Sequence, residues 1–169
     1  MNTSIHPPIQ PAPLWHEPHD ATSFVVGERQ PRVLVVEDDP VQALILTLML
    51  KHLGVSSMLV TDGEQAIEAV KGRSYALVLM DYLMPGTDGI AATRSIRRWE
   101  RDTGRLPTPI AAVTASAMAD ECQRYAEAGM DDVLIKPYSA QTLAELLARH
   151  GPTLCGVQAP VFNRLGARS

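Results

Sequence analysis

The chain has few cysteines and few aromatic residues. Only two of its 169 residues are cysteines, Cys122 and Cys155, and no metal-ligand spacing or disulfide framework surrounds them. Aromatic side chains make up 5% of the sequence, so a core has to be built mainly from Val, Leu, Ile, Ala and Met. The sequence therefore argues against a disulfide-stapled domain and against a cysteine-ligated metal centre.

Long apolar runs and an excess of basic charge are also missing. The longest apolar stretch, Ala43–Leu50, is interrupted by Thr47 and is far too short to cross a bilayer. The first residues contain neither the basic nor the apolar segment of a secretory signal. A formal net charge of −4 gives no general attraction to nucleic acid or to an anionic membrane. We expect a cytoplasmic protein with no membrane span and no nucleic-acid partner.

Proline is abundant where the sequence starts, and its density there is incompatible with a helix or a central strand. We predict a disordered or extended arm over residues 1–30, an ordered domain over residues 31–150 and a tail over residues 151–169. His16 and His19, in the arm, have a spacing that could hold a metal. No further ligand accompanies them, so we assign no site to them.

Two patterns alternate between these ends. Short runs are apolar at successive positions, as in strands that are buried on both faces, and each run is followed by a helical segment. Strict alternation predicts an α/β fold with a doubly wound, five-stranded parallel sheet, helices on both faces and right-handed crossovers. The expected strands are 33–36, 57–60, 76–80, 110–113 and 133–135, and the expected helices are 40–53, 63–71, 89–102, 117–128 and 139–149.

Candidate site residues follow four of the five expected strands directly. In such sheets ligands bind beyond the carboxyl ends of the strands, and these ends meet at one edge. We therefore expect acids, a hydroxyl and a lysine to converge there, which is the strongest functional signal in the sequence. The residues are Glu37, Asp38 and Asp39 after the first strand, Asp81 after the third, Thr114, Ala115 and Ser116 after the fourth, and Lys136 after the fifth.

The chemistry of this edge suits a phosphoryl group. Clustered carboxylates are costly unless a cation neutralises them, and Mg²⁺ prefers oxygen ligands. Lys136 would add a fixed positive charge, Thr114 a hydroxyl, and the backbone N–H of Ala115 a further donor. Asp81 could then attack phosphorus in line while the metal and Lys136 stabilise the phosphoryl oxygens. Each residue alone also fits an ordinary loop or helix cap, so the hypothesis rests on their convergence.

Four stretches of the sequence resemble the receiver domain of two-component response regulators. The resemblance implies a flavodoxin-like strand order of 2-1-3-4-5. The sequence of residues 129–137 is most similar to receivers attached to, or derived from, hybrid sensor kinases. The matching stretches are 33–40, 77–85 with 88–89, 113–115 and 129–137.

The resemblance implies that Asp81 is the phosphoacceptor. The donor would be the phosphohistidine of a histidine kinase or of a histidine phosphotransfer protein. Thr114 would be the switch hydroxyl, and Lys136 would contact a phosphoryl oxygen. Beyond self-phosphorylation and self-dephosphorylation no enzymatic activity is expected, so the output would be binding to a downstream protein.

The same resemblance implies a Mg²⁺ site. Asp38 and Asp81 would be direct ligands, and Glu37 would act through water. The backbone carbonyl of Leu83 would complete the protein ligands. Asp39 lies one position past the acidic pair, and we interpret it as a helix cap.

Three positions depart from the family pattern. Many relatives carry Tyr, Phe or His three residues before the lysine, where this chain has Val133. The coupling between Thr114 and an aromatic ring is therefore in question. Leu83 and Ser116 each lie two residues after a site residue, along the path of the water that hydrolyses an acyl phosphate. We expect the apolar Leu83 to change the lifetime of the phosphoryl group.

Two alternative functions stay open. A receiver-like interaction module that is never phosphorylated would be compatible with Val133. A phosphatase of the haloacid-dehalogenase type also uses an aspartate nucleophile and Mg²⁺ at a strand end. That class needs a second aspartate two residues after the first, and this chain has Leu83 there.

Two of the expected helices have unusual surfaces. The helix over 40–53 is apolar on nearly every side, so Leu44 and Leu48 are either exposed or covered by the terminal arms. If exposed, they would form a docking face for a histidine-bearing helical bundle, as the resemblance implies. We interpret a cluster of arginines in the helix over 89–102 as its solvated face: Arg94, Arg97, Arg98 and Arg101.

Overall fold

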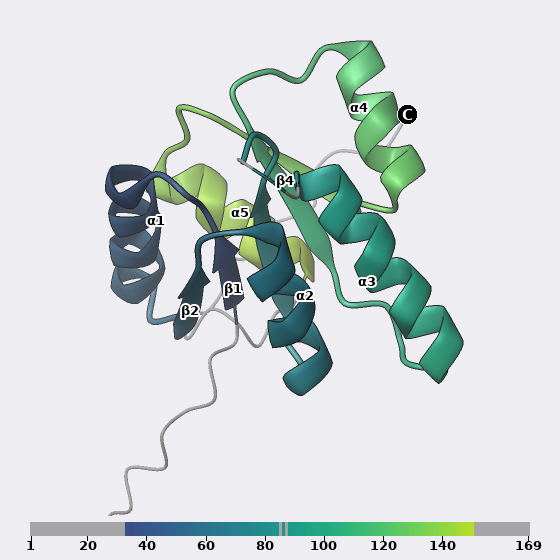
Figure 1. Cartoon of the computed structure of the whole chain (residues 1–169). Helices are drawn as coiled ribbons and strands as arrows, with labels where there is room; N and C mark the ends of the chain where they lie inside the picture. The colour runs from purple at the N-terminus through teal and green to yellow at the C-terminus, as the bar shows by residue number, and fades with distance from the viewer. Residues whose placement is uncertain (1–32, 85, 87, 151–169) are drawn as a thin grey trace, which may run out of the picture.

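A computed structural model of the chain describes residues 33–84, 86 and 88–150 (Figure 1). The predicted arm and tail, with His16, His19 and Cys155, lie outside the described residues. Within the described part, five strands alternate with five helices, as expected. They are β1 (Val33–Val36), α1 (Pro40–His52), β2 (Ser57–Val60), α2 (Gly63–Gly72), β3 (Leu77–Asp81), α3 (Gly89–Thr103), β4 (Ile110–Thr114), α4 (Ala119–Ala128), β5 (Asp132–Ile135) and α5 (Ala140–His150).

The strands form one parallel sheet in the order β2-β1-β3-β4-β5, which confirms the predicted fold class and strand order. Every residue of β1, β3 and β4 is buried. Parallel strands that are covered on both faces need apolar side chains at successive positions. The three central strands therefore hold the sheet between two layers of helices.

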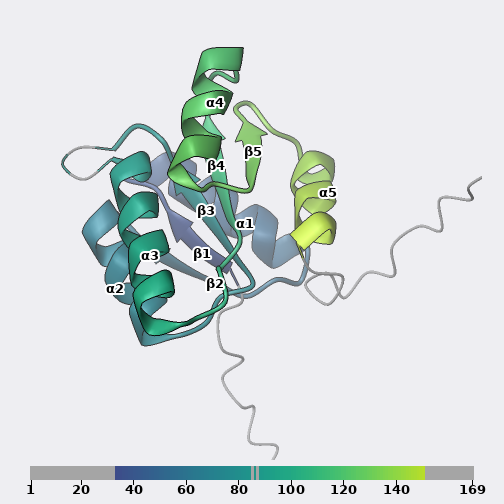
Figure 2. The same cartoon turned by 90° about the vertical axis from the view of Figure 1, so that its right-hand side faces the viewer.

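The helices divide between the two faces of the sheet. α1 and α5 cover one face, and α2, α3 and α4 cover the other (Figure 2). Alternate residues of each strand point to opposite faces, so Leu34 and Val36 belong to the core beneath α2, α3 and α4. Val33 and Val35 pack instead beneath α1 and α5. Two apolar cores result, one on each face.

Helix starts are set by residues in extended conformation. Asp39 is the N-cap of α1, and its carboxylate accepts hydrogen bonds of 2.9 Å from the backbone N–H groups of Val41 and Gln42. The predicted role of Asp39 as a helix cap is confirmed. α4 begins at Ala119, two residues later than predicted, because Met118 is extended (φ −64°, ψ 154°) and serves as the N-cap.

The exposed face of α1 is apolar, as the sequence allowed. Leu44 and Leu48 are 58% and 54% exposed, and Val41 and Ile45 beside them are 63% and 49% exposed. We refer to these four residues as the α1 apolar strip. Among the described helices, none combines the length and the hydropathy that crossing a membrane requires.

The interpretation of the arginine cluster is wrong for Arg97. This residue is 9% exposed, and its guanidinium forms ion pairs with Glu100 at 2.7 Å and with Asp131 at 2.9 Å. Its Nε also donates to the carbonyl of Gly129. Buried charges are tolerated when they are paired. Glu100 lies one turn further along α3, whereas Asp131 lies outside the helix. The other members are exposed, as expected: Arg94, Arg98 and Arg101.

Candidate functional site

The register of the central strands brings the acidic residues together. β1 and β3 pair in parallel with Val36 opposite Met80, so the next residues, Glu37 and Asp81, lie side by side. Asp81 is the last residue of β3, rather than the first residue after it as predicted. Asp38 follows Glu37 in the connection to α1. The predicted convergence of acids at this edge is present.

β4 and β5 deliver the other two groups. Thr114 is the last residue of β4 and pairs with Ile135, so Lys136 emerges beside it. The backbone N–H of Lys136 donates to the carbonyl of Thr114 at 2.7 Å. All these side chains line one cleft, together with Gln42 and Tyr82, which sequence reasoning missed. The lining residues are Glu37, Asp38, Asp39, Gln42, Asp81, Tyr82, Leu83, Thr114, Ala115 and Lys136.

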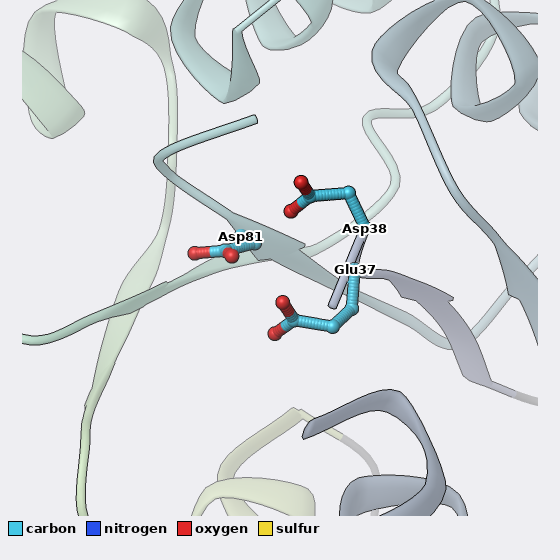
Figure 3. Close-up of side chains that lie close together, drawn as sticks. All are labelled: Glu37, Asp38 and Asp81. Atoms are coloured by element: carbon cyan, nitrogen blue, oxygen red, sulfur yellow. The ribbon is translucent and has the colours of Figure 1, made fainter. Parts of the chain in front are cut away.

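Three carboxylates converge at the centre of this cleft. Figure 3 shows the side chains of Glu37, Asp38 and Asp81 turned toward a shared space. One oxygen of each lies within 4.8 Å of the others, while Glu37 and Asp81 are buried and Asp38 is exposed. Burial raises the pKa of Glu37; the Lys136 ammonium opposes this shift, and the nearby Asp81 carboxylate adds to it. The cluster is therefore short of positive charge.

Lys136 supplies one cation to this cluster. Its Nζ lies 2.9 Å from Oε2 of Glu37 and 3.3 Å from Oδ2 of Asp81. Three ionised carboxylates facing one ammonium leave a formal charge of −2, which a divalent ion would balance. Oxygen donors of this kind fit Mg²⁺ well, because Mg²⁺ binds through a few carboxylates and keeps several waters. Leu83 lines the same cleft, and the resemblance implies that its backbone carbonyl is a further ligand.

Thr114 is held by contacts outside the acidic cluster. It is 4% exposed, and its Oγ1 accepts hydrogen bonds from the Ser116 N–H at 3.3 Å and from the Tyr125 hydroxyl at 3.1 Å. Tyr125 belongs to α4 and was not predicted as a site residue. Ala115 lies next to Thr114 in the cleft lining.

Tyr138 is a further residue that sequence reasoning missed. It follows Lys136 by two positions and packs against the core beneath α1 and α5. Burial, together with the negative charges of Glu37 and Asp81, raises its pKa to about 12. The phenol therefore responds to the same carboxylates as Lys136. The sequence signal that could have indicated this residue is a Tyr two positions after the predicted lysine.

Comparisons with known proteins agree with this geometry. The profile of the response regulator receiver domain matches residues 33–148. The chain is 38% identical over 141 residues to the sensor histidine kinase GacS of Pseudomonas protegens, covering 83% of this chain and 15% of GacS. The chain thus spans less than a fifth of that relative.

Two solved structures add to the comparison. One is the receiver domain of a sensor histidine kinase from Pseudomonas aeruginosa, with a magnesium ion coordinated in its active-site cleft. It shares 38% identity with a TM-score of 0.63, covering 69% of this chain and 93% of that one. The other is the Saccharomyces cerevisiae receiver domain of Ssk1, crystallised with the histidine phosphotransfer protein Ypd1. It shares 28% identity with a TM-score of 0.68, covering 78% of this chain and 92% of that one. The chain belongs to the response regulator receiver domain family of two-component phosphorelay signalling.

Proposed function

We propose that this chain accepts a phosphoryl group from a phosphohistidine onto Asp81 and thereby changes its binding to another protein. The observation that carries the proposal is the position of the Asp81 carboxylate. It is 6% exposed and lies between two further carboxylates and the Lys136 ammonium, at the open edge of the sheet. A nucleophile placed there faces both a site for a cation and a fixed positive charge.

The proposed transfer uses these groups in defined roles. A carboxylate oxygen of Asp81 attacks phosphorus, the bond from phosphorus to the donor imidazole nitrogen breaks, and that nitrogen keeps the electron pair and takes up a proton. Lys136 stabilises charge on a phosphoryl oxygen, and the Thr114 hydroxyl and the Ala115 N–H donate to the others. Lys136 already contacts Asp81, so little reorganisation is needed.

The acidic cluster would hold Mg²⁺. We assign Asp38 and Asp81 as direct ligands, Glu37 as a ligand through water, and the backbone carbonyl of Leu83 as the remaining protein ligand. The ion would neutralise the carboxylates and the incoming phosphoryl oxygens. Support comes from the close approach of the three carboxylates and from the magnesium ion in the P. aeruginosa relative.

The α1 apolar strip is our candidate for docking the phosphohistidine donor. Its four side chains are between 49% and 63% exposed on the helix that begins next to the acidic pair. The donor would be a histidine kinase or a histidine phosphotransfer protein, the class of partner bound to the yeast relative. A helical bundle could bury this strip while its histidine reaches the cleft.

Intact mass spectrometry tests the phosphoacceptor directly. The full chain is incubated with Mg²⁺ and an acyl phosphate or a phosphoramidate, and one added phosphoryl mass is expected. Asp81→Asn should abolish it. Asp62→Asn is the matched control, because Asp62 caps α2 and does not line the cleft. Absence of the added mass in wild type would overturn the proposal in favour of an unphosphorylated interaction module. Turnover of a simple phosphate ester would point instead to a phosphatase.

Docking is tested by comparing two donors. Leu48→Glu should slow transfer from a phosphorylated phosphotransfer protein but leave phosphorylation by the small-molecule donor unchanged. Leu106→Glu is the control, since Leu106 is 90% exposed but follows α3, away from the strip. Equal slowing by both variants, or slowing with both donors, would contradict docking through α1.

The three-part division of the chain and its cytoplasmic location stay predictions.

A further inference from the structure

Tyr125 makes a buried hydrogen bond to the hydroxyl at the end of β4. The residue is 2% exposed, and its phenolic hydroxyl donates to Oγ1 of Thr114 at 3.1 Å. Burial raises the pKa of Tyr125, so the phenol keeps its proton and stays a donor. α4 is thereby linked to the cleft by a side chain that solvent does not reach.

The hydrogen bonds of Thr114 leave its proton free for the cleft. A hydroxyl has one proton to donate and two lone pairs that accept. Here Oγ1 accepts from both Tyr125 and the Ser116 N–H, so neither contact uses the Thr114 proton. Thr114 also lines the cleft that contains Asp81. Tyr125 therefore holds this hydroxyl in the state needed to donate to an oxygen bound there.

A second contact joins Tyr125 to the other side of the cleft. Its ring meets the ring of Tyr82 edge-to-face, with centroids 5.2 Å apart and an interplanar angle of 69°. Tyr82 directly follows Asp81, and the guanidinium of Arg124 in α4 lies 5.8 Å from the Tyr82 ring. Two neighbouring residues of α4 thus contact the residues at the ends of both β3 and β4.

β5 offers no ring for this role. Val133 packs, partly buried, against the same apolar core that contains Tyr125. A valine has no polar atom with which to reach Thr114. The buried ring and the hydroxyl that contact Thr114 come from α4 instead.

We infer that Tyr125 is the positioning residue for Thr114 and that it couples α4 to the phosphorylation state of Asp81. The inference rests on the proposed function. A phosphoryl group that accepts the Thr114 proton acts on the same hydroxyl that Tyr125 contacts, and α4 carries that contact. If phosphorylation changes the affinity of α4 for a partner protein, then by linkage binding of that protein changes the equilibrium constant for phosphorylation by the same factor.

The test uses Tyr125→Phe, which keeps the ring but removes the donor. Amide hydrogen exchange across residues 119–128 is measured before and after phosphorylation by the small-molecule donor, with intact mass recorded in parallel. Wild type should show a change in α4, and the variant should show at most a small fraction of it. The variant should also phosphorylate roughly 2- to 10-fold more slowly, the effect of losing one hydrogen bond. Tyr75→Phe is the control: Tyr75 is buried, and its hydroxyl contacts Met58 rather than the cleft.

A double-mutant cycle separates positioning from a merely structural role. If Tyr125 acts through Thr114, then Thr114→Ala with Tyr125→Phe should be no slower than Thr114→Ala alone. Additive effects, or an α4 response in Tyr125→Phe equal to that of wild type, would overturn the inference while phosphorylation itself stands. Absence of phosphoryl mass in wild type would overturn the proposed function, and this inference with it.

Discussion

Arg97 and Asp131, which are 34 residues apart in the sequence, form an ion pair of 2.9 Å that joins α3 to the turn before β5. The same oxygen of Asp131 accepts from the backbone N–H of Ile110, the first residue of β4. Glu100 completes the network through the other side of the guanidinium, and it also accepts from the Thr108 N–H. One buried arginine thus connects a helix, a strand start and a turn.

Replacing this arginine should be costly. Arg97→Met would leave Glu100, which is 2% exposed, without its cationic partner, and we expect a loss of roughly 3 kcal/mol in the free energy of unfolding. Urea unfolding followed by circular dichroism measures this loss. Arg98→Met, one residue along on the exposed face of α3, should change stability by less than about 0.5 kcal/mol. Similar losses for the two variants would show that the network adds little.

Gly89 lies against the backbone of Asp81. A Cβ on Gly89 would collide with the Asp81 carbonyl oxygen and would come within 3.0 Å of Met80 Cγ. Gly89→Ala should therefore destabilise the domain by roughly 1–3 kcal/mol and slow phosphorylation, because the chain around Asp81 has to shift. Unfolding and intact-mass time courses measure the two effects. Gly72→Ala is the control, since nothing lies within 4 Å of its added Cβ. Wild-type behaviour of Gly89→Ala would contradict the close approach.

Mg²⁺ should stabilise the folded chain through the acidic cluster. An ion that binds only the folded state adds about 2.7 kcal/mol at 100 times its Kd, and this appears as a rise in Tm. Asp38→Asn should lose most of that rise. Asp39→Asn should keep it, because Asp39 caps α1 and asparagine caps a helix equally well. Calorimetric scans with and without Mg²⁺ measure the rise in Tm of each variant. An equal loss of that rise in both variants would indicate a diffuse charge effect instead of a site at Asp38.

Mg²⁺ binding should also weaken on acidification. The pKa of Glu37 is raised from 4.5 by burial, and a protonated carboxyl no longer attracts the cation. Without metal, acidification has the opposite effect and favours the folded state. The contribution of Glu37 to stability is present below pH 4.5 and is lost as pH rises through the raised pKa. The Tm rise given by Mg²⁺ should therefore shrink as the pH falls through the raised pKa of Glu37, and Glu37→Gln should flatten that dependence. An unchanged pH profile in Glu37→Gln would assign the proton elsewhere.

The edge of the sheet was predictable because its geometry follows from strand polarity. Parallel strands end at one edge, so Glu37, Asp81 and Lys136 could be brought together without knowledge of any helix position. Tyr125 could not, because its contact with Thr114 depends on how α4 lies over the sheet. No local pattern encodes that placement.

The error at Arg97 has a similar cause. An arginine in an amphipathic helix is normally exposed, and helical periodicity alone does not reveal a partner far along the chain. Asp131 is that partner, and only tertiary structure brings it to α3.

The contact between Lys136 and Glu37 joins residues that are 99 positions apart in the sequence. During synthesis, Glu37, which follows β1, and Asp81, which ends β3, leave the ribosome well before the lysine that contacts them. A nascent or prematurely terminated chain that lacks β5 would thus hold the acids without their ammonium. The charge balance around Asp81 is consequently a property of the finished domain, because its one contacting ammonium among the described residues comes from the residue after β5.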